Sequence, residues 1–116
     1  MKENIIKNKS FAFAIRIVKL YKYLIDTKKE FVLSKQLLRS GTAIGALVRE
    51  SEHAESKADF VHKLSIALKE ANETEYWILL LKETEYLSDD MFQSIQLDAQ
   101  EIIKLLVSIL KTTKSK

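Results

Sequence analysis

The 116-residue sequence predicts an all-α fold, an antiparallel up-and-down four-helix bundle that forms one domain over residues 1–116. Three observations support this prediction. The chain has no Pro and only two Gly, whereas a sheet protein needs many turn residues. Apolar residues recur at helical spacing in four segments, which short polar links separate. Hydrophobic residues make up 47% of the chain, enough to fill the core of such a bundle.

The first two helices are expected over about residues 10–27 and 35–54. The first has an apolar face wider than one core-facing stripe, which indicates a second contact surface. The link "TKKEF" between the two helices is mostly polar. Ser34 directly precedes the second helix, so its hydroxyl group can act as the N-cap.

Both glycines of the chain, Gly41 and Gly45, lie four residues apart inside the second predicted helix. Glycine in a helix interior costs about 1 kcal/mol relative to alanine, so the pair needs a compensating reason. The spacing places both on one helix face, where a second backbone can approach closely. The approaching helix can belong to the same chain or to another subunit, and a local kink is the alternative explanation.

The last two helices are expected over about residues 57–86 and 89–112. Ser56 and Asp59 have the spacing of a capping box, which places the start of the third helix close to residue 57. Ser88 can cap the fourth helix, and the acidic residues that follow it favour a helix N-terminus. Both segments keep apolar residues at helical spacing along their length.

Charge is distributed unevenly along the chain, although the net charge is only +3. Residues 1–49 carry 11 basic and 3 acidic side chains, whereas residues 50–101 carry 4 basic and 13 acidic ones. A basic face can bind nucleic acid, and the candidates, with Tyr23 beside them, are Arg16, Lys19, Lys22, Lys28, Lys29, Lys35 and Arg39. Alternatively, oppositely charged helices lie beside each other or beside a neighbouring subunit, or the lysines serve solubility.

Tyr76 and Trp77 begin a dense apolar run in the third predicted helix. One core-facing stripe cannot accommodate so many apolar side chains, and the first helix has a wide apolar face as well. Together they predict a subunit interface and therefore a homo-oligomer. A flavin or haem site is the alternative use of such aromatic residues, but aromatic side chains at helical spacing favour core or interface, so we expect no cofactor.

Two carboxylate–histidine pairs give the strongest indication of enzymatic chemistry. Glu50 with His53, and Asp59 with His62, each place a carboxylate and an imidazole three residues apart on one helix face. Di-iron bundles use two Glu-x-x-His pairs and two further Glu residues on separate helices, and this set is incomplete here. We therefore predict no enzyme and no bound metal, and a metal-dependent enzyme built on these four residues is the alternative.

Three stretches within residues 35–77 resemble one protein family. They are "KQLLRSGTAIGA", "AESKADFVHKLSIALKE" and "ETEYW". These stretches are similar to the four-helix-bundle proteins related to those encoded by intervening sequences in bacterial 23S ribosomal RNA genes. The first and fourth predicted helices resemble that family only in their pattern.

The resemblance implies a left-handed bundle without known catalytic activity that commonly assembles as a ring-like homopentamer. It also implies RNA or DNA as a partner, because a relative of this fold is an accessory protein of retroelements that binds a reverse transcriptase and nucleic acid. Arg39, Glu50 and Glu73 match the family, and we expect them to form a buried ion pair or network. Ala43 and Leu47 depart from the family, whose members usually carry Ser and Asn there.

The sequence thus predicts a non-catalytic, self-associating module that binds nucleic acid or a protein, and a pure protein–protein adaptor is a further alternative. The longest uncharged stretch, residues 40–48, is much shorter than the roughly 20 apolar residues that a membrane span needs, so no membrane partner is expected. The first ten residues, "MKENIIKNKS", lack the apolar core of a signal peptide, and a cytoplasmic location is expected.

Overall fold

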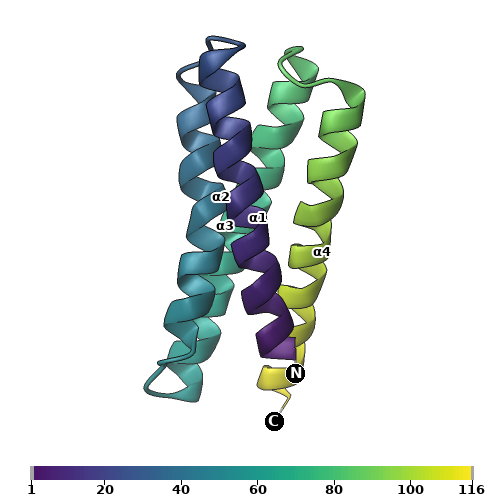
Figure 1. The fold of residues 1–116 in the computed structure, drawn as a ribbon. Coiled ribbons are helices and arrows are strands. Elements are labelled where there is room, and N and C mark those ends of the chain that lie inside the picture. The colour runs from purple at the N-terminus through teal and green to yellow at the C-terminus, as the bar shows by residue number, and fades with distance from the viewer. Residues whose placement is uncertain (1, 116) are drawn as a thin grey trace.

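The computed structural model describes residues 2–115, and the side chains of residues 5–115. Four helices form the fold, and they are α1 (Lys2–Asp26), α2 (Leu33–Ser51), α3 (Lys57–Glu83) and α4 (Asp89–Lys114). Each helix runs antiparallel to the next, and α1 and α3 both pack on α2 and α4 (Figure 1). The all-α antiparallel four-helix bundle is therefore confirmed, while its left-handed sense stays a prediction.

The bundle is elongated, with extents of 46 × 21 × 19 Å along its principal axes. The α1–α2 and α3–α4 turns lie at one end, and the α2–α3 turn lies at the other end together with both ends of the chain (Figure 1). Within residues 2–115, no helix has the combination of length and apolar character that crossing a membrane requires.

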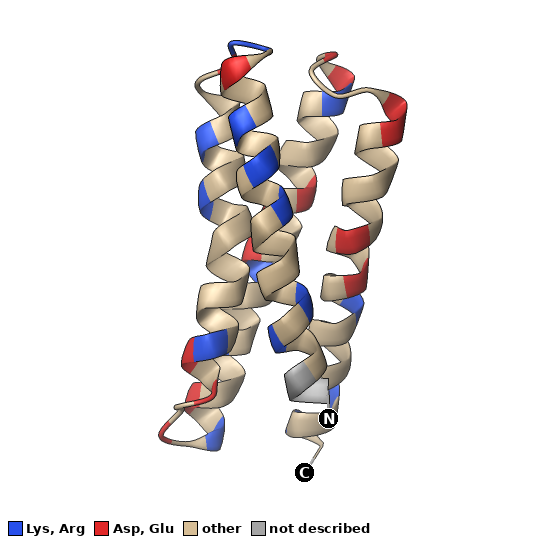
Figure 2. Cartoon of the chain, viewed as in Figure 1, with Lys and Arg blue, Asp and Glu red and all other residues tan. Residues whose placement is uncertain are grey.

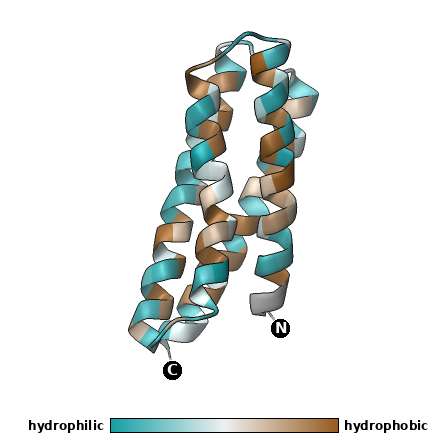
Figure 3. Cartoon of the chain, turned by 60° about the vertical axis from the view of Figure 1, so that its left-hand side comes forward, coloured by the Kyte–Doolittle hydropathy of each residue, from teal (hydrophilic) through white to brown (hydrophobic). Residues whose placement is uncertain are grey.

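One apolar stripe from each helix builds the core, and hydrophobic and hydrophilic bands alternate along the helices (Figure 3). In α1 the buried stripe contains Phe13, Ile17 and Leu24, whereas Phe11 and Ile15 remain exposed. The wide apolar face of α1 is therefore divided into a buried stripe and an exposed stripe. The buried residues of the other helices include Leu37, Ile44, Val48, Leu64, Ala67, Ala71, Ile78, Leu81, Ile95, Ala99, Ile102, Leu106 and Ile109.

Helix α1 begins at Lys2, about two turns before the expected start near residue 10. Ile6 is only 1% exposed, so this early segment contributes to the core. Exposed ion pairs also join it to the rest of the bundle, from Lys7 to Glu52 (3.2 Å) and from Lys9 to Glu101 (2.9 Å). The expected start was wrong because the contacts of this segment are made with residues far along the chain.

Both glycines of α2 face α1 of the same chain. A Cβ atom added at Gly41 would lie 2.8 Å from Cγ1 and 2.9 Å from Cγ2 of Ile17, and one added at Gly45 would lie 3.3 Å from the carbonyl oxygen of Ser10. Neither glycine has a positive φ, so no unusual backbone conformation requires them. The close approach of α1 explains the glycine pair. The approaching helix therefore belongs to the same chain and not to another subunit.

Two of the three predicted helix caps are confirmed. The Ser56 hydroxyl accepts a hydrogen bond from the Asp59 N–H (3.0 Å), and the Ser88 hydroxyl accepts one from the Met91 N–H (3.2 Å). The third prediction, that Ser34 caps α2, is wrong, because Ser34 lies inside that helix and is fully buried.

Helix α3 ends at Glu83, three residues earlier than expected, and Glu85 beyond it has a φ of 69°.

Candidate nucleic-acid interface

Five of the seven predicted nucleic-acid-binding residues are exposed at the end of the bundle where α1 turns into α2. We name these lysines the basic corner, and they are Lys19, Lys22, Lys28, Lys29 and Lys35. None of the five forms an ion pair with a residue that the structure describes. Lys and Arg gather on this part of α1 and α2, while acidic residues predominate at the facing end of α3 and α4 (Figure 2). The basic corner is therefore a surface of five exposed lysines that form no ion pair with a described residue.

A buried carboxylate holds the turn that carries the basic corner. The side chain of Glu30 accepts hydrogen bonds from the backbone N–H groups of Val32 (3.1 Å), Leu33 (3.0 Å) and Ser34 (2.6 Å). The Ser34 hydroxyl donates in return to the Glu30 carbonyl oxygen (2.7 Å). Glu30, rather than Ser34, therefore caps α2, a role that was not predicted from the sequence.

The electrostatic environment of Glu30 favours its ionised form. Burial raises the pKa of this carboxyl group, but the N–H groups of Leu33, Ser34 and Val32 together outweigh burial. The pKa of Glu30 therefore lies below its ordinary value of 4.5. The preceding residue, Lys29, has a φ of 57°, a left-handed conformation that turns the chain sharply before the cap.

Arg16 was expected on the nucleic-acid-binding surface, but it binds α4 instead. Its guanidinium forms an ion pair with Asp98 and donates hydrogen bonds to the hydroxyl (2.8 Å) and carbonyl (3.3 Å) oxygens of Ser94. These contacts join residues that are about 80 positions apart in the sequence, so spacing gave no sign of them. Arg16 therefore fastens α1 to α4 and is not free to contact a phosphate.

A groove of about 580 Å³ opens between α1 and α4 beside Arg16. Its apolar lining residues are Leu20, Met91 and Ile95, and Tyr23 lines it as well. Its remaining lining residues are Arg16, Lys19, Asp90 and Ser94. Because Lys19 belongs to both features, the groove adjoins the basic corner.

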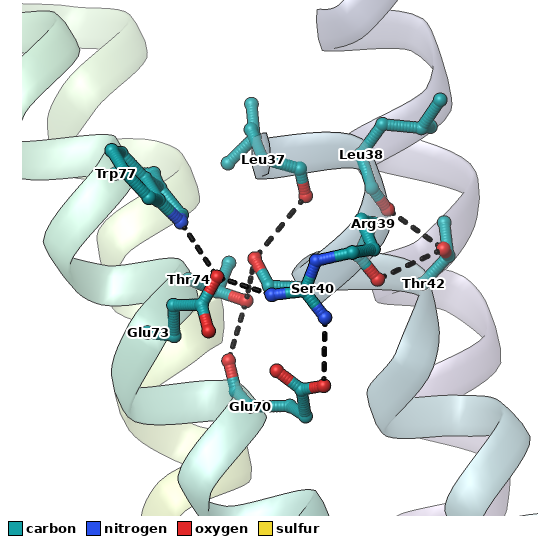
Figure 4. Close-up of polar contacts among 9 residues, drawn as sticks. All are labelled: Leu37, Leu38, Arg39, Ser40, Thr42, Glu70, Glu73, Thr74 and Trp77. Carbon is teal, nitrogen blue, oxygen red and sulfur yellow. Dashed lines mark hydrogen bonds and ion pairs between the residues drawn. The ribbon is translucent and has the colours of Figure 1, made fainter. Parts of the chain in front are cut away.

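Arg39, the seventh candidate, lies on the outer side of the α2–α3 contact and is paired (Figure 4). Its guanidinium binds the carboxylates of Glu70 (3.0 Å) and Glu73, and the indole N–H of Trp77 donates to Glu73 (2.9 Å). The Trp77 N–H lowers the pKa of Glu73, burial opposes that effect, and Arg39 lowers the pKa further. The Arg39 side chain is 51% exposed, so this network is at the surface rather than buried.

The expected network of Arg39, Glu50 and Glu73 is therefore wrong in two respects. Besides being exposed, it contains Glu70 in place of Glu50. Glu50 lies farther along α2 and forms an exposed ion pair with Lys63 (3.1 Å). The buried polar contact between α2 and α3 is instead a hydrogen bond of 3.0 Å between the hydroxyl groups of Ser40 and Thr74 (Figure 4).

The two carboxylate–histidine pairs do not converge on a metal site. Within the described residues, no group of three or more His, Cys, Asp or Glu side chains could hold a metal ion. His53 and His62 are exposed, Glu50 binds Lys63, and the Asp59 carboxylate accepts from the Glu55 N–H (3.2 Å). The alternative of a metal-dependent enzyme therefore has no geometric support in this part of the chain.

The expected interface residues of α3 differ in their surroundings. Tyr76 is 58% exposed, whereas Trp77 is half-buried against the core and bonded to Glu73. Their rings meet edge to face, with centroids 5.1 Å apart. Leu79, one turn farther along α3, is exposed too. Tyr76 and Leu79 thus form an outward apolar patch, and its use as a subunit contact stays a prediction.

Two exposed apolar residues in the turn of the basic corner were not predicted from the sequence. Phe31 and Val32 follow Glu30 directly, and they are 54% and 71% exposed. The available signal was an aromatic residue inside a polar, lysine-rich link. Ala43 and Leu47, the two positions at which the family resemblance implies polar residues, are both partly exposed on α2, and Leu47 packs against the core.

The fold and this surface define a small helical-bundle protein with a positive corner and, in its described part, no cluster of metal ligands. The model of the 23S rRNA-intervening sequence protein family matches residues 2–108. The chain therefore belongs to that family, and the predicted resemblance is confirmed.

A solved structure supports the same assignment. It is the crystal structure of a protein with unknown function from the S23 ribosomal protein family of Bacteroides thetaiotaomicron VPI-5482, and it matches this chain with a TM-score of 0.95. The two chains are 61% identical, and the match covers 96% of this chain and 99% of the other. No match was found among curated proteins. Neither the family model nor the solved structure assigns a catalytic activity.

Proposed function

We propose that this protein is a non-catalytic, oligomeric module that binds nucleic acid, preferentially RNA, through the basic corner. The observation that carries the proposal is the absence of any ion-pair partner, within residues 5–115, for the five lysines of that corner. Unpaired lysines on one surface attract a polyanion, since each phosphate contact releases condensed counterions. The family description, which refers to an intervening sequence of ribosomal RNA, favours RNA as the polyanion.

The composition of the basic corner indicates the kind of contact it makes. All five residues are lysines, and the two nearest arginines, Arg16 and Arg39, are held by carboxylates of the bundle itself. Lysine contacts phosphates as a point charge, whereas specific base readout in grooves relies chiefly on the fork of arginine. Binding should therefore depend strongly on salt and weakly on sequence. The acidic turn between α3 and α4, with Glu83, Glu85 and Asp89 exposed, repels the polyanion from the facing side.

Reversing charges at the basic corner provides the test. We expect the triple variant Lys28→Glu, Lys29→Glu and Lys35→Glu to bind a fluorescent single-stranded RNA about 100-fold more weakly at low salt. The plot of log affinity against log salt should also become shallower, by about 0.7 for each phosphate that the variant no longer neutralises. Fluorescence anisotropy over a salt series measures both quantities.

The matched control for this test reverses three other exposed lysines, Lys69→Glu, Lys104→Glu and Lys111→Glu, which form no ion pair with a described residue. It makes the same change in net charge on other faces of the bundle. Equal decreases in affinity for the two triple variants would mean that only net charge matters. That result would remove the basic corner as the binding site.

The oligomeric part of the proposal is a homopentamer, as the family resemblance implies. Support comes from exposed apolar residues on two different helices, Phe11 and Ile15 on α1 and Tyr76 and Leu79 on α3. When unlike faces of identical subunits meet and the rotation closes, a ring results. Such a ring would repeat the basic corner on every subunit and strengthen binding through avidity.

Native mass spectrometry tests the assembly. We expect the wild-type chain to form a pentamer and the double variant Tyr76→Ser and Leu79→Ser to form smaller species, because the variant removes apolar contact area. Leu97→Ser serves as a control, since Leu97 is an exposed apolar residue on α4. A double variant with the wild-type mass would exclude this patch as a contact, and a monomeric wild-type protein would refute the pentamer.

A further inference from the structure

Phe31 and Val32 are the exposed apolar residues of the turn that carries the basic corner. The turn is positively charged around them, since Lys28 and Lys29 precede Phe31 and Lys35 follows it within about one helical turn. None of these three lysines is paired with a described residue. An exposed aromatic ring among unpaired cations is the combination with which proteins bind single-stranded nucleic acid.

The structure holds this turn in place. The Glu30 carboxylate fixes the N–H groups of Val32, Leu33 and Ser34, and the Glu30 N–H donates to the Leu24 carbonyl oxygen (2.9 Å). The backbone on both sides of Phe31 is thereby anchored to α1 and α2. The Phe31 ring is thus presented to solvent by a fixed turn, and ordering the backbone of this turn is not an added cost of binding.

We propose that Phe31 stacks on an unpaired base of a single-stranded nucleic acid whose phosphates contact the lysines of the basic corner. This inference rests on the proposed function and specifies its substrate class. Bases in a duplex are stacked on one another and do not offer a free face, whereas bases in single strands and loops do. Every base has such a face, so the contact adds affinity for single strands without requiring a particular sequence.

The test compares Phe31→Ala with wild-type protein on two RNA probes, an oligo-uridine of about 12 nucleotides and an RNA duplex of equal length. We expect Phe31→Ala to bind the single strand about 10-fold more weakly and the duplex with unchanged affinity. Phe31→Tyr keeps a stacking ring and should bind both probes like the wild type. Leu97→Ala is the control for removal of an exposed apolar side chain elsewhere.

Each outcome separates this inference from the proposed function. If the triple lysine variant binds RNA more weakly and Phe31→Ala does not, stacking is refuted while the basic corner stands. If wild-type protein binds neither RNA probe, the proposed function itself fails. If Phe31→Ala forms smaller oligomers in native mass spectrometry and binds RNA like the wild type, the ring makes a subunit contact and the inference is overturned. If Phe31→Ala loses binding to vesicles of anionic lipid and binds RNA like the wild type, the ring contacts a membrane and the inference is likewise overturned. Circular dichroism melting curves establish that all variants fold.

Discussion

Replacing Gly41 with leucine is expected to destabilise the bundle by about 3 kcal/mol or more, the upper end of the range for overpacked cores. Even a single Cβ atom at this position would lie 2.8 Å from Cγ1 and 2.9 Å from Cγ2 of Ile17. These atoms branch from the Cβ of a fully buried side chain, so they cannot move aside easily. Leucine must therefore push α1 away from α2. The gain in helix propensity, about 0.8–1.0 kcal/mol, is too small to compensate.

Urea denaturation followed by circular dichroism measures this effect, with the protein concentration held constant because oligomers gain stability with concentration. Ala46→Leu is the control, since Ala46 is exposed on the same helix. Combining Gly41→Leu with Ile17→Ala removes the three Ile17 atoms nearest to a Cβ atom at position 41, so the double variant should be destabilised by less than the sum of the two single effects. A Gly41→Leu protein as stable as Ala46→Leu would contradict the close approach of α1.

Replacing Glu30 with alanine is expected to destabilise the protein by about 3 kcal/mol, because it removes a charged acceptor from three backbone donors. Glu30→Gln keeps the shape of the side chain and one acceptor oxygen, so its effect on stability should be smaller. Thermal or urea unfolding at pH 7 measures both. As a control, Glu83→Ala alters an exposed glutamate at the other turn of the same end, and little change is expected.

The stabilisation by Glu30 also depends on pH in a defined direction. The pKa of Glu30 is lower in the folded protein than its ordinary value of 4.5, so the carboxylate stabilises the fold fully above that value. The advantage of wild-type protein over Glu30→Gln should shrink as the pH falls below 4.5 and through the folded pKa. Comparing the two proteins removes the contribution of other carboxylates, such as Glu73. A difference that stays constant down to about pH 3 would show that the charge of Glu30 is not what matters.

The parts of the fold that depend on local sequence were predictable. Ser56 and Ser88 cap α3 and α4 as expected, because a cap involves residues only three positions apart. The paired glycines also predicted a close helix contact, since their cost in a helix interior requires compensation. The identity of the approaching helix could not be predicted, because it depends on the packing of the whole bundle.

The parts that depend on distant residues were not predictable. The basic first part of the sequence predicts Arg16 on the nucleic-acid surface, yet its partner Asp98 is on α4. The first turns of α1 were not predictable because Ile6 belongs to a core whose other members, such as Val48 and Leu64, lie far along the chain.

The candidate site was predicted only in outline. The five lysines of the basic corner follow from charge and helix position, which sequence provides directly. The mostly polar composition of the link "TKKEF" does not indicate the roles of two residues within it, Glu30 and Phe31. Glu30 is buried there and accepts three backbone hydrogen bonds, and Phe31 remains exposed despite being aromatic. Whether a loop residue points inward or outward depends on the three-dimensional turn, and composition does not determine it.

The contact between α1 and α4 is the one helix contact of the described bundle that joins elements distant in the sequence. The other three helix contacts join neighbours in the chain, and such local hairpins form quickly because closing their short loops costs little entropy. The α1–α4 contact joins segments about 80 to 90 residues apart and should form last. Interactions that form after the transition state mainly slow unfolding. The ion pairs of Lys9 and Arg16 across this contact would therefore prolong the lifetime of the native bundle more than they speed its formation.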